Sequence, residues 1–147
     1  MIANALELMV PILLAALGGL LTERAGVLNI GLEGLILAGA FAGIVGANAF
    51  DSQLAGLFAG AAAGGLLAAL YSVACLELRA NIFVAGLATN LLAAGIVPYL
   101  SALLYDTKGV VRLTGEPGFA SLFGVSIMVP IGLVFAAVVA IALYETP

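Results

Sequence analysis

Few residues in this sequence could take part in chemistry, and most of them lie inside long apolar runs. Glu33 is the plainest case: it stands within the run 25–50, between Gly31 and Gly34. If that run crosses a bilayer, an ionised side chain deep inside it costs on the order of 3 kcal/mol. The position therefore predicts one of two roles. Glu33 is either a pathway or gating residue, or an interface carboxylate close to Arg24.

Two asparagines are the other polar candidates. Asn29 precedes Glu33 by four residues, so on a continuous helix the two side chains would share one face. Asn90 stands beside Thr89 in the middle of another apolar run. A buried amide in lipid needs hydrogen-bond partners, and a neighbouring helix commonly supplies them. Asn90 is interpreted first as a link between helices and second as a substrate contact. Direct substrate binding is the least favoured role for Glu33.

The residues needed for most enzyme mechanisms are missing from the sequence. The chain has no histidine and one cysteine, Cys75, and it lacks a GxxxxGK[ST] phosphate-binding loop. We therefore predict no catalytic residue, no metal site and no cofactor bound by this chain. A charge of −4 without a basic cluster also argues against nucleic acid as a partner.

The composition is that of a membrane protein. Hydrophobic residues make up 65% of the 147 residues and charged residues 8%, whereas a soluble domain carries about 25% charged residues. The mean hydropathy is +1.30. Four positive and eight negative side chains could not cover a surface that faces water, so the lipid bilayer is the expected surroundings.

Charged residues divide the sequence into five apolar runs. A helix of about 20 apolar residues crosses the hydrocarbon core and satisfies its own backbone hydrogen bonds. We therefore predict an all-α fold, a polytopic transmembrane helix bundle of about five spans, as one transmembrane domain over 1–147. The first run has no positive residue before it and is interpreted as a retained span rather than a signal peptide. The runs are 8–21 (from Ile2 if Glu7 lies at the interface), 25–50, 54–76, 80–105 and 119–144.

Small residues form ridges on two of the predicted spans. Gly39 and Gly43 are four residues apart, and Gly56, Gly60 and Gly64 continue the same spacing on the next span. Helices in lipid associate through close backbone packing, which such ridges permit. The glycines are interpreted as helix-packing residues. The alternative interpretation, that helices rich in glycine slide or tilt, stays open.

Prolines and connections complete the layout. Pro11, Pro98 and Pro130 fall inside the first, fourth and fifth runs, where each removes a backbone donor and can kink its helix. The one long connection is 106–118. Its Gly-Glu-Pro-Gly stretch favours turns.

The positive residues do not decide the orientation. Arg24 and Arg79 lie on one predicted side, and Lys108 and Arg112 lie with the terminal amine on the other. The positive-inside rule counts such residues and gives no preference here.

Two segments resemble a known family. TERAGVLNIGLEGLILAGAFAG, residues 22–43, resembles the signature of permeases in bacterial nucleoside and simple-sugar ABC importers, and LRANIFVAGLATNLLAAG, residues 78–95, resembles their next conserved block. The order, spacing and hydrophobic layout agree as far as Tyr144. Ile82 departs from the family, which commonly has a polar residue there, and this weakens the inference of a substrate.

The resemblance implies a subunit of a larger transporter. Its partners would be a second permease subunit, cytoplasmic ATPase subunits that bind the ATP, and an extracytoplasmic substrate-binding protein. Asn29, Glu33 and Asn90 match the polar positions of the two motifs, so they are the candidates for the substrate pathway or gate. The implied location is the cytoplasmic (inner) membrane, with Met1 outside and Pro147 inside.

The resemblance also implies that 1–147 is the N-terminal part of a permease, because family members continue with a coupling loop and further helices. The substrate expected first is a nucleoside, and a simple sugar next. Two other functions remain open: a membrane scaffold or assembly subunit that transports nothing, and a small secondary transporter. The latter commonly has internal repeats and charges at the midplane, and the sequence has only Glu33.

Overall fold

The structure is a computed structural model that describes residues 2–107, 110–113, 121–122 and 125–145. The described residues form five α-helices and two very short strands, which confirms the predicted polytopic helical fold. The chain divides into two compact units, 1–27 with 118–147 and 28–117. The prediction of one transmembrane domain stays a prediction.

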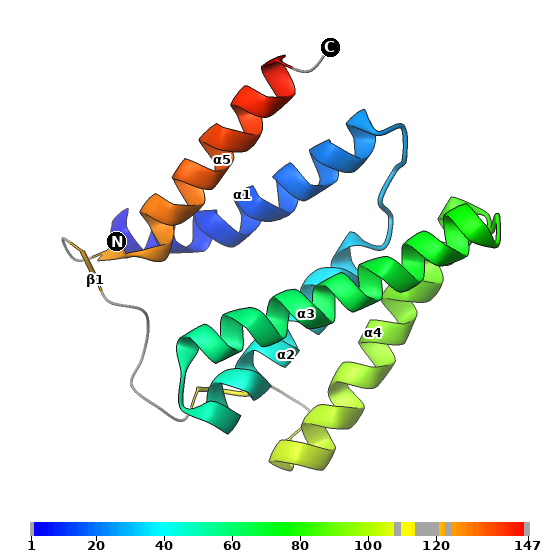
Figure 1. Cartoon of the computed structure of the whole chain (residues 1–147). Coiled ribbons are helices and arrows are strands. Elements are labelled where there is room, and N and C mark those ends of the chain that lie inside the picture. Colours follow the sequence, from blue (N-terminus) through cyan, green and yellow to red (C-terminus); the bar gives the residue numbers. More distant parts are fainter. Residues whose placement is uncertain (1, 108–109, 114–120, 123–124, 146–147) are drawn as a thin grey trace. The chain divides into compact units, whose positions relative to one another are not determined.

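The larger unit contains three helices and one π-helical turn. They are α2 (Leu32–Phe50), α3 (Gln53–Ser72), η1 (Val73–Glu77) and α4 (Ile82–Tyr105). Figure 1 shows α3 running along α2, while α2 also packs against α4. The contacts between α3 and α4 are few, so α2 is the central helix of this unit.

Close backbone contacts join α2 and α3. A Cβ added at Gly60 would lie 2.8 Å from the Gly39 carbonyl oxygen, and one added at Gly56 would lie 2.6 Å from that of Gly43. Larger side chains at these positions would push the two backbones apart. The fifth glycine of the two ridges, Gly64, is less crowded, since its added Cβ would be 3.8 Å from the Leu35 carbonyl oxygen.

The connections of this unit use residues that suit tight turns. Asp51, at the end of α2, has a φ of 45°, and the Ser52 hydroxyl then accepts a hydrogen bond from the Ala55 N–H (3.5 Å) at the start of α3. A short side-chain oxygen before a helix satisfies one of the N–H groups that lack an intrahelical partner. Arg79 (φ 53°) and Asp106 (φ 56°) also adopt left-handed backbone, before and after α4.

The smaller unit pairs the first and last helices. α1 (Ile2–Arg24) packs against α5 (Met128–Glu145), and β1 (Ser121–Leu122) pairs antiparallel with β2 (Val125–Ser126). Glu7 accepts a hydrogen bond from the Ser126 N–H (2.9 Å). At the other end of α1 the Arg24 guanidinium donates to the Leu143 carbonyl (2.7 Å). The two helices therefore run in the same direction, as expected of the first and fifth spans of a five-span chain.

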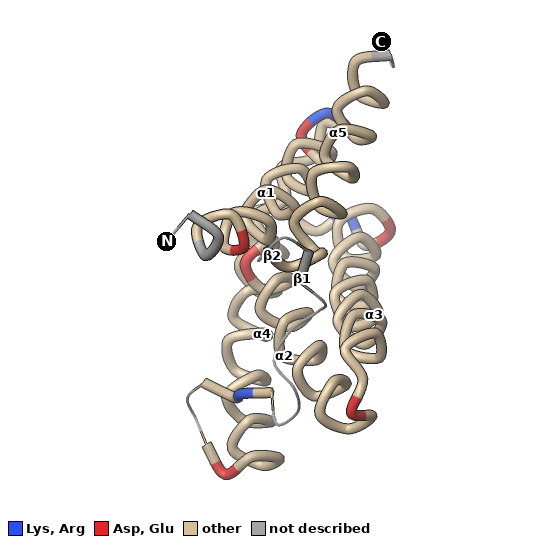
Figure 2. The backbone as a smooth tube through the Cα atoms, turned by 90° about the vertical axis from the view of Figure 1, so that its left-hand side faces the viewer, with Lys and Arg blue, Asp and Glu red and all other residues tan. Residues whose placement is uncertain are grey.

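Four helices of the described residues are long and apolar enough to cross a membrane: Ala5–Arg24, Leu32–Phe50, Gln53–Glu77 and Ile82–Tyr105. Apolar residues continue over Met128–Tyr144, a shorter stretch. Its helix, α5, has 18 residues, near the lower end of the roughly 17–25 that span a bilayer. Figure 2 shows long uncharged stretches, with acidic and basic residues at or near the helix ends and connections.

Two predicted span boundaries are wrong. The second helix begins at Leu32 and not near 25, because Asn29 and Gly31 are poor helix formers and other helices satisfy the backbone there. The fifth helix begins at Met128, after the two strands; Phe119 lies outside the described residues. Pro130 therefore stands in the first turn of α5, where a missing N–H costs little, so it does not kink the span. Pro11 and Pro98 do lie inside α1 and α4.

Candidate functional site

The candidate site is the place where the chain enters α2. We call residues 28–31 the lead-in segment; they are non-helical and stand directly before the first residue of α2, Leu32. Side chains of α3 and α4 hold this segment from two sides. Within the segment the Ile30 N–H donates to the Leu28 carbonyl at 3.1 Å. The other backbone groups need partners from outside the segment, since an unpaired N–H or C=O in an apolar interior costs free energy comparable to a lost hydrogen bond.

Asn90, on α4, provides the strongest of these contacts. Its Nδ2 donates to the Ile30 carbonyl at 2.9 Å, and its Oδ1 accepts from the Gly34 N–H at 2.8 Å. The first four N–H groups of a helix have no intrahelical acceptor, and that of Gly34 is one of them. Asn90 therefore replaces the N-cap that Gly31 has no side chain to provide. Thr89, its neighbour, donates its own hydroxyl to the Ala85 carbonyl at 2.8 Å.

Tyr71, near the end of α3, holds the other end of the lead-in segment. Its ring is 8% exposed, and its hydroxyl lies 3.4 Å from the Leu28 carbonyl oxygen and 3.5 Å from that of Ile82. Both distances are long for an O–H···O hydrogen bond. The hydroxyl has one proton, which these two carbonyls share. Tyr71 thus joins α3 to the lead-in segment and to the first residue of α4.

Glycines allow α4 to approach the segment closely. A Cβ added at Gly34 would lie 2.8 Å from the Thr89 carbonyl oxygen and 3.0 Å from the Asn90 Cα. One added at Gly86 would lie 2.7 Å from the Ile30 Cβ. Without these two glycines the Asn90 amide could not reach both backbone partners.

Asn29 lies within the lead-in segment and not on α2. Its Oδ1 is buried and has no hydrogen-bond partner among the residues that the structure describes. A Cβ added at Gly31 would be 3.6 Å from this oxygen and 3.5 Å from the Thr89 Cβ, so the Asn29 amide is close to the contact with α4. An unsatisfied buried acceptor costs about 1–3 kcal/mol, and a donor that reached it would recover that energy.

Glu33 occupies the first turn of α2 and is exposed within the unit. The prediction that Asn29 and Glu33 share a helix face is wrong, because the helix begins after Asn29. Within this unit the side chain is not a buried charge. Its negative charge is instead favourable there, since the unpaired N–H groups give a helix N-terminus a partial positive charge.

The site lies well along α4. Asn90 follows Ile82, the first residue of α4, by eight positions, which is about 12 Å along a helix that rises 1.5 Å per residue. If α4 crosses a bilayer, the first turn of α2 begins inside the membrane. Non-helical backbone at such depth is tolerated where protein buries it or where it lines a cavity. The lead-in segment meets the first condition through Tyr71 and Asn90.

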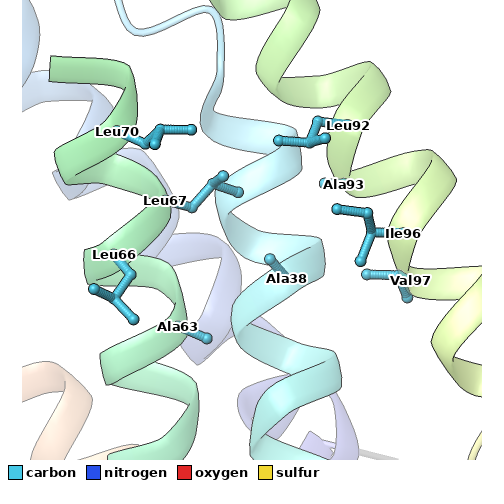
Figure 3. A pocket seen from close by; sticks show the side chains of 9 residues that line it. All are labelled: Ala38, Ala63, Leu66, Leu67, Leu70, Leu92, Ala93, Ile96 and Val97. Atoms are coloured by element: carbon cyan, nitrogen blue, oxygen red, sulfur yellow. The ribbon is translucent and has the colours of Figure 1, made fainter. Parts of the chain in front are cut away.

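A separate apolar hollow lies between α2, α3 and α4 (Figure 3). Its volume is about 360 Å³, and the side chains that Figure 3 labels are all alanine, leucine, isoleucine or valine. Such a lining offers no hydrogen bond to a polar solute. A second hollow of about 310 Å³ includes Ser101, whose hydroxyl already donates to the Thr107 carbonyl (2.8 Å). Neither hollow presents the converging polar groups found at the start of α2.

Sequence reasoning selected Asn29, Glu33 and Asn90, and the structure gathers all three around the start of α2 without making Asn29 and Glu33 neighbours on one helix. It also adds a residue that the sequence analysis did not consider, Tyr71. The one available signal was its type: a phenol in an otherwise aliphatic run needs a polar partner for its hydroxyl.

Membrane-length helices and a cluster of polar groups where the chain enters the second of them are together characteristic of membrane transport subunits. The chain belongs to the family described as the permease component of the branched-chain amino acid transport system, which matches residues 1–147.

Named relatives are permeases of ABC transporters. The guanosine permease protein NupQ of Bacillus subtilis is 40% identical over 101 residues, which is 65% of this chain and 32% of that protein. The nucleoside permease protein NupC of Lactococcus lactis is 31% identical over 144 residues, 91% of this chain and 44% of that protein. The putative glucose permease protein TsgC13 of Haloferax volcanii is 38% identical over 91 residues, 62% of this chain and 28% of that protein.

The chain thus spans less than half the length of these relatives, from 28% to 44% of each. No solved structure matches it.

Proposed function

We propose that this chain is a permease component of an ABC importer that moves nucleosides or simple sugars, powered by separate ATPase subunits. The observation that carries the proposal is that the permease family matches the chain over residues 1–147. The names of the relatives favour a nucleoside as substrate and a simple sugar as the alternative. The partners would be a second permease subunit, cytoplasmic ATPases and an extracytoplasmic binding protein, with the bilayer as surroundings.

The polar cluster at the start of α2 is the proposed pathway or gate. Asn90 is committed to backbone groups, so its role is to shape the site rather than to bind solute. Asn29 has an acceptor oxygen without a donor, and nucleosides and sugars both carry hydroxyl donors. Because that oxygen is buried, solute would reach it only after the lead-in segment moves. Glu33 stands exposed next to this segment and is the charged candidate for the gate.

The substrate is tested through the complete transporter. The extracytoplasmic binding protein proposed as a partner would be screened by thermal shift against purine and pyrimidine nucleosides and simple sugars, and uptake of each ligand would be measured in cells. We expect saturable nucleoside uptake that disappears when the phosphate-loop lysine of the ATPase partner is replaced. Normal folding and assembly without uptake of any such solute would favour the scaffold function.

Glu33→Gln tests the gate in the same transporter. We expect normal membrane insertion and reduced uptake, because the change keeps the size of the side chain and removes its charge. The matched control is Glu77→Gln, an exposed carboxylate at the end of η1, which should leave uptake unchanged. Uptake equal to that of the native chain would return Glu33 to the role of an interface carboxylate.

The proposed location is the inner membrane with Met1 outside and Pro147 inside. In a Cys75→Ala background, Ser52→Cys and Thr107→Cys should react with an impermeant thiol reagent added outside, and Thr22→Cys should not. The reverse pattern of labelling would invert the orientation and contradict this part of the proposal.

A further inference from the structure

Tyr71 is a buried residue with a polar hydroxyl, and the proposed function gives it no role. It lies on α3, whose membrane-length run Gln53–Glu77 is otherwise almost wholly aliphatic. The residue is 8% exposed, and the carbonyl oxygens of Leu28 (3.4 Å) and Ile82 (3.5 Å) lie within hydrogen-bond distance of its hydroxyl. A polar group in such apolar surroundings lowers the stability of the protein unless it forms hydrogen bonds.

The two acceptors belong to the two chain segments that form the site. Leu28 begins the lead-in segment, and Ile82 begins α4, the helix that carries Asn90. Asn90 in turn reaches Ile30 and Gly34. The lead-in segment is therefore held at one end by α3 and at the other by α4. Losing the contact with Tyr71 would leave the Leu28 carbonyl with the Ile30 N–H as its donor (3.1 Å), which lies in the same segment. The segment would then be held less firmly against α3, and its contact with Asn90 would weaken.

We propose that Tyr71 is a positioning residue, whose hydroxyl fixes the lead-in segment so that Asn90 can cap the first turn of α2. It contacts no solute itself and acts through the Leu28 and Ile82 carbonyls. Its effect on transport rests on the proposed function, whereas its effect on the segment can be measured without transport.

The structural test is amide hydrogen exchange of the chain in nanodiscs, comparing the native chain with Tyr71→Phe. The phenyl ring keeps the packing and only the hydroxyl is lost. We expect the Gly34 amide, which Tyr71 does not touch, to exchange about 2- to 5-fold faster, the factor for one long hydrogen bond of about 0.5–1 kcal/mol. Tyr99→Phe on α4, where the ring is 67% exposed, is the matched control and should change nothing.

A double variant tests whether the two side chains act together. Asn90→Ala should speed Gly34 exchange more than Tyr71→Phe does, and adding Tyr71→Phe to it should bring no further increase, since the cap is already lost. Unchanged Gly34 exchange in Tyr71→Phe would overturn the proposal. So would additive effects in the double variant, or loss of protection throughout α2 to α4, which marks a general packing role.

The transport test uses the complete transporter. Tyr71→Phe should lower the maximal uptake rate several-fold and leave the substrate concentration for half-maximal uptake unchanged, because the binding protein and not this residue captures the solute. A normal rate together with faster Gly34 exchange would overturn the link to transport. Absence of uptake even with the native chain would refute the proposed function and leave the exchange result intact.

Discussion

The starts of α2 and α4 are both capped by an asparagine, yet the two asparagines come from different distances in the sequence. Asn81 precedes α4 directly, and its Oδ1 accepts from the N–H groups of Phe83 (2.9 Å) and Val84 (3.4 Å). Asn90 caps α2 from another helix, 56 residues beyond the Gly34 N–H that it binds. One cap is local, and the other forms only when the unit has assembled.

The difference separates a self-sufficient helix start from a dependent one. The start of α4 has the acceptor for its first N–H groups within three residues, so this cap is kept when contacts elsewhere in the unit are lost. The start of α2 depends on Asn90, which binds its backbone, and on Tyr71, which holds the lead-in segment. It also depends on Gly86, which lets α4 approach closely. A helix start that depends on other elements can also be changed by them, which is what a gate requires.

The largest expected effect is that of Gly34→Ala. The added Cβ would meet backbone atoms, the Thr89 carbonyl oxygen at 2.8 Å and the Asn90 Cα at 3.0 Å, which cannot swing aside as a side chain does. We expect a loss of about 1–3 kcal/mol, as for other overpacked cores. Thermal unfolding in nanodiscs measures it.

The control for this prediction is Gly95→Ala on α4, where an added Cβ has nothing within 4 Å. Alanine is the better helix former, so this change should leave stability unchanged or raise it slightly. Equal effects of the two substitutions would mean that α4 does not press on the first turn of α2.

Asn90→Ala should have the next largest effect. It leaves the Ile30 carbonyl and the Gly34 N–H without their partners. Interhelical hydrogen bonds in membrane proteins average about 0.6 kcal/mol, so we expect the two together to cost about 1–2 kcal/mol. Exchange measurements should locate the loss at the start of α2 and leave the start of α4 protected.

Asn81→Ala tests the local cap. Removing an N-cap costs about 1 kcal/mol, and the loss should be confined to the first turn of α4. Faster exchange at Phe83 and Val84 with an unchanged Gly34 amide is the expected pattern. A response of Gly34 as strong as that of Phe83 would show that the two helix starts are not independent.

Glu33→Gln should have the smallest effect on stability. An exposed carboxylate in the first turn interacts with the helix dipole by a few tenths of a kcal/mol, so we expect a loss of about that size. A buried charge would behave oppositely, since its neutralisation would raise the midpoint of thermal unfolding by several degrees. Such a rise in the unfolding midpoint would indicate that the Glu33 side chain is buried and not on the surface of the unit.

The sequence was sufficient for the five helices, because long apolar runs bounded by charges are typical of helices that cross a membrane. It did not predict the two short strands or the π-helical turn. It was also sufficient for the polar candidates, since Asn29, Glu33 and Asn90 stand out by type. It could not locate the start of α2, because hydropathy treats 25–31 as apolar whether or not the backbone is helical. Tyr71 was missed for a related reason: its partners are backbone carbonyls, which have no signature in the sequence.

The long separation in sequence between the start of α2 and Asn90, which caps it, has a consequence for biosynthesis. Ile30 precedes its partner Asn90 by 60 residues. At about 5–20 residues per second, a ribosome makes that stretch in roughly 3–12 s. Throughout this interval the Ile30 carbonyl lacks its donor and the Gly34 N–H lacks its acceptor. The glycines that let α2 and α3 pack together are already present in the chain. The helical hairpin is therefore expected to enter the membrane first, with the start of α2 held at the wet interface until α4 arrives.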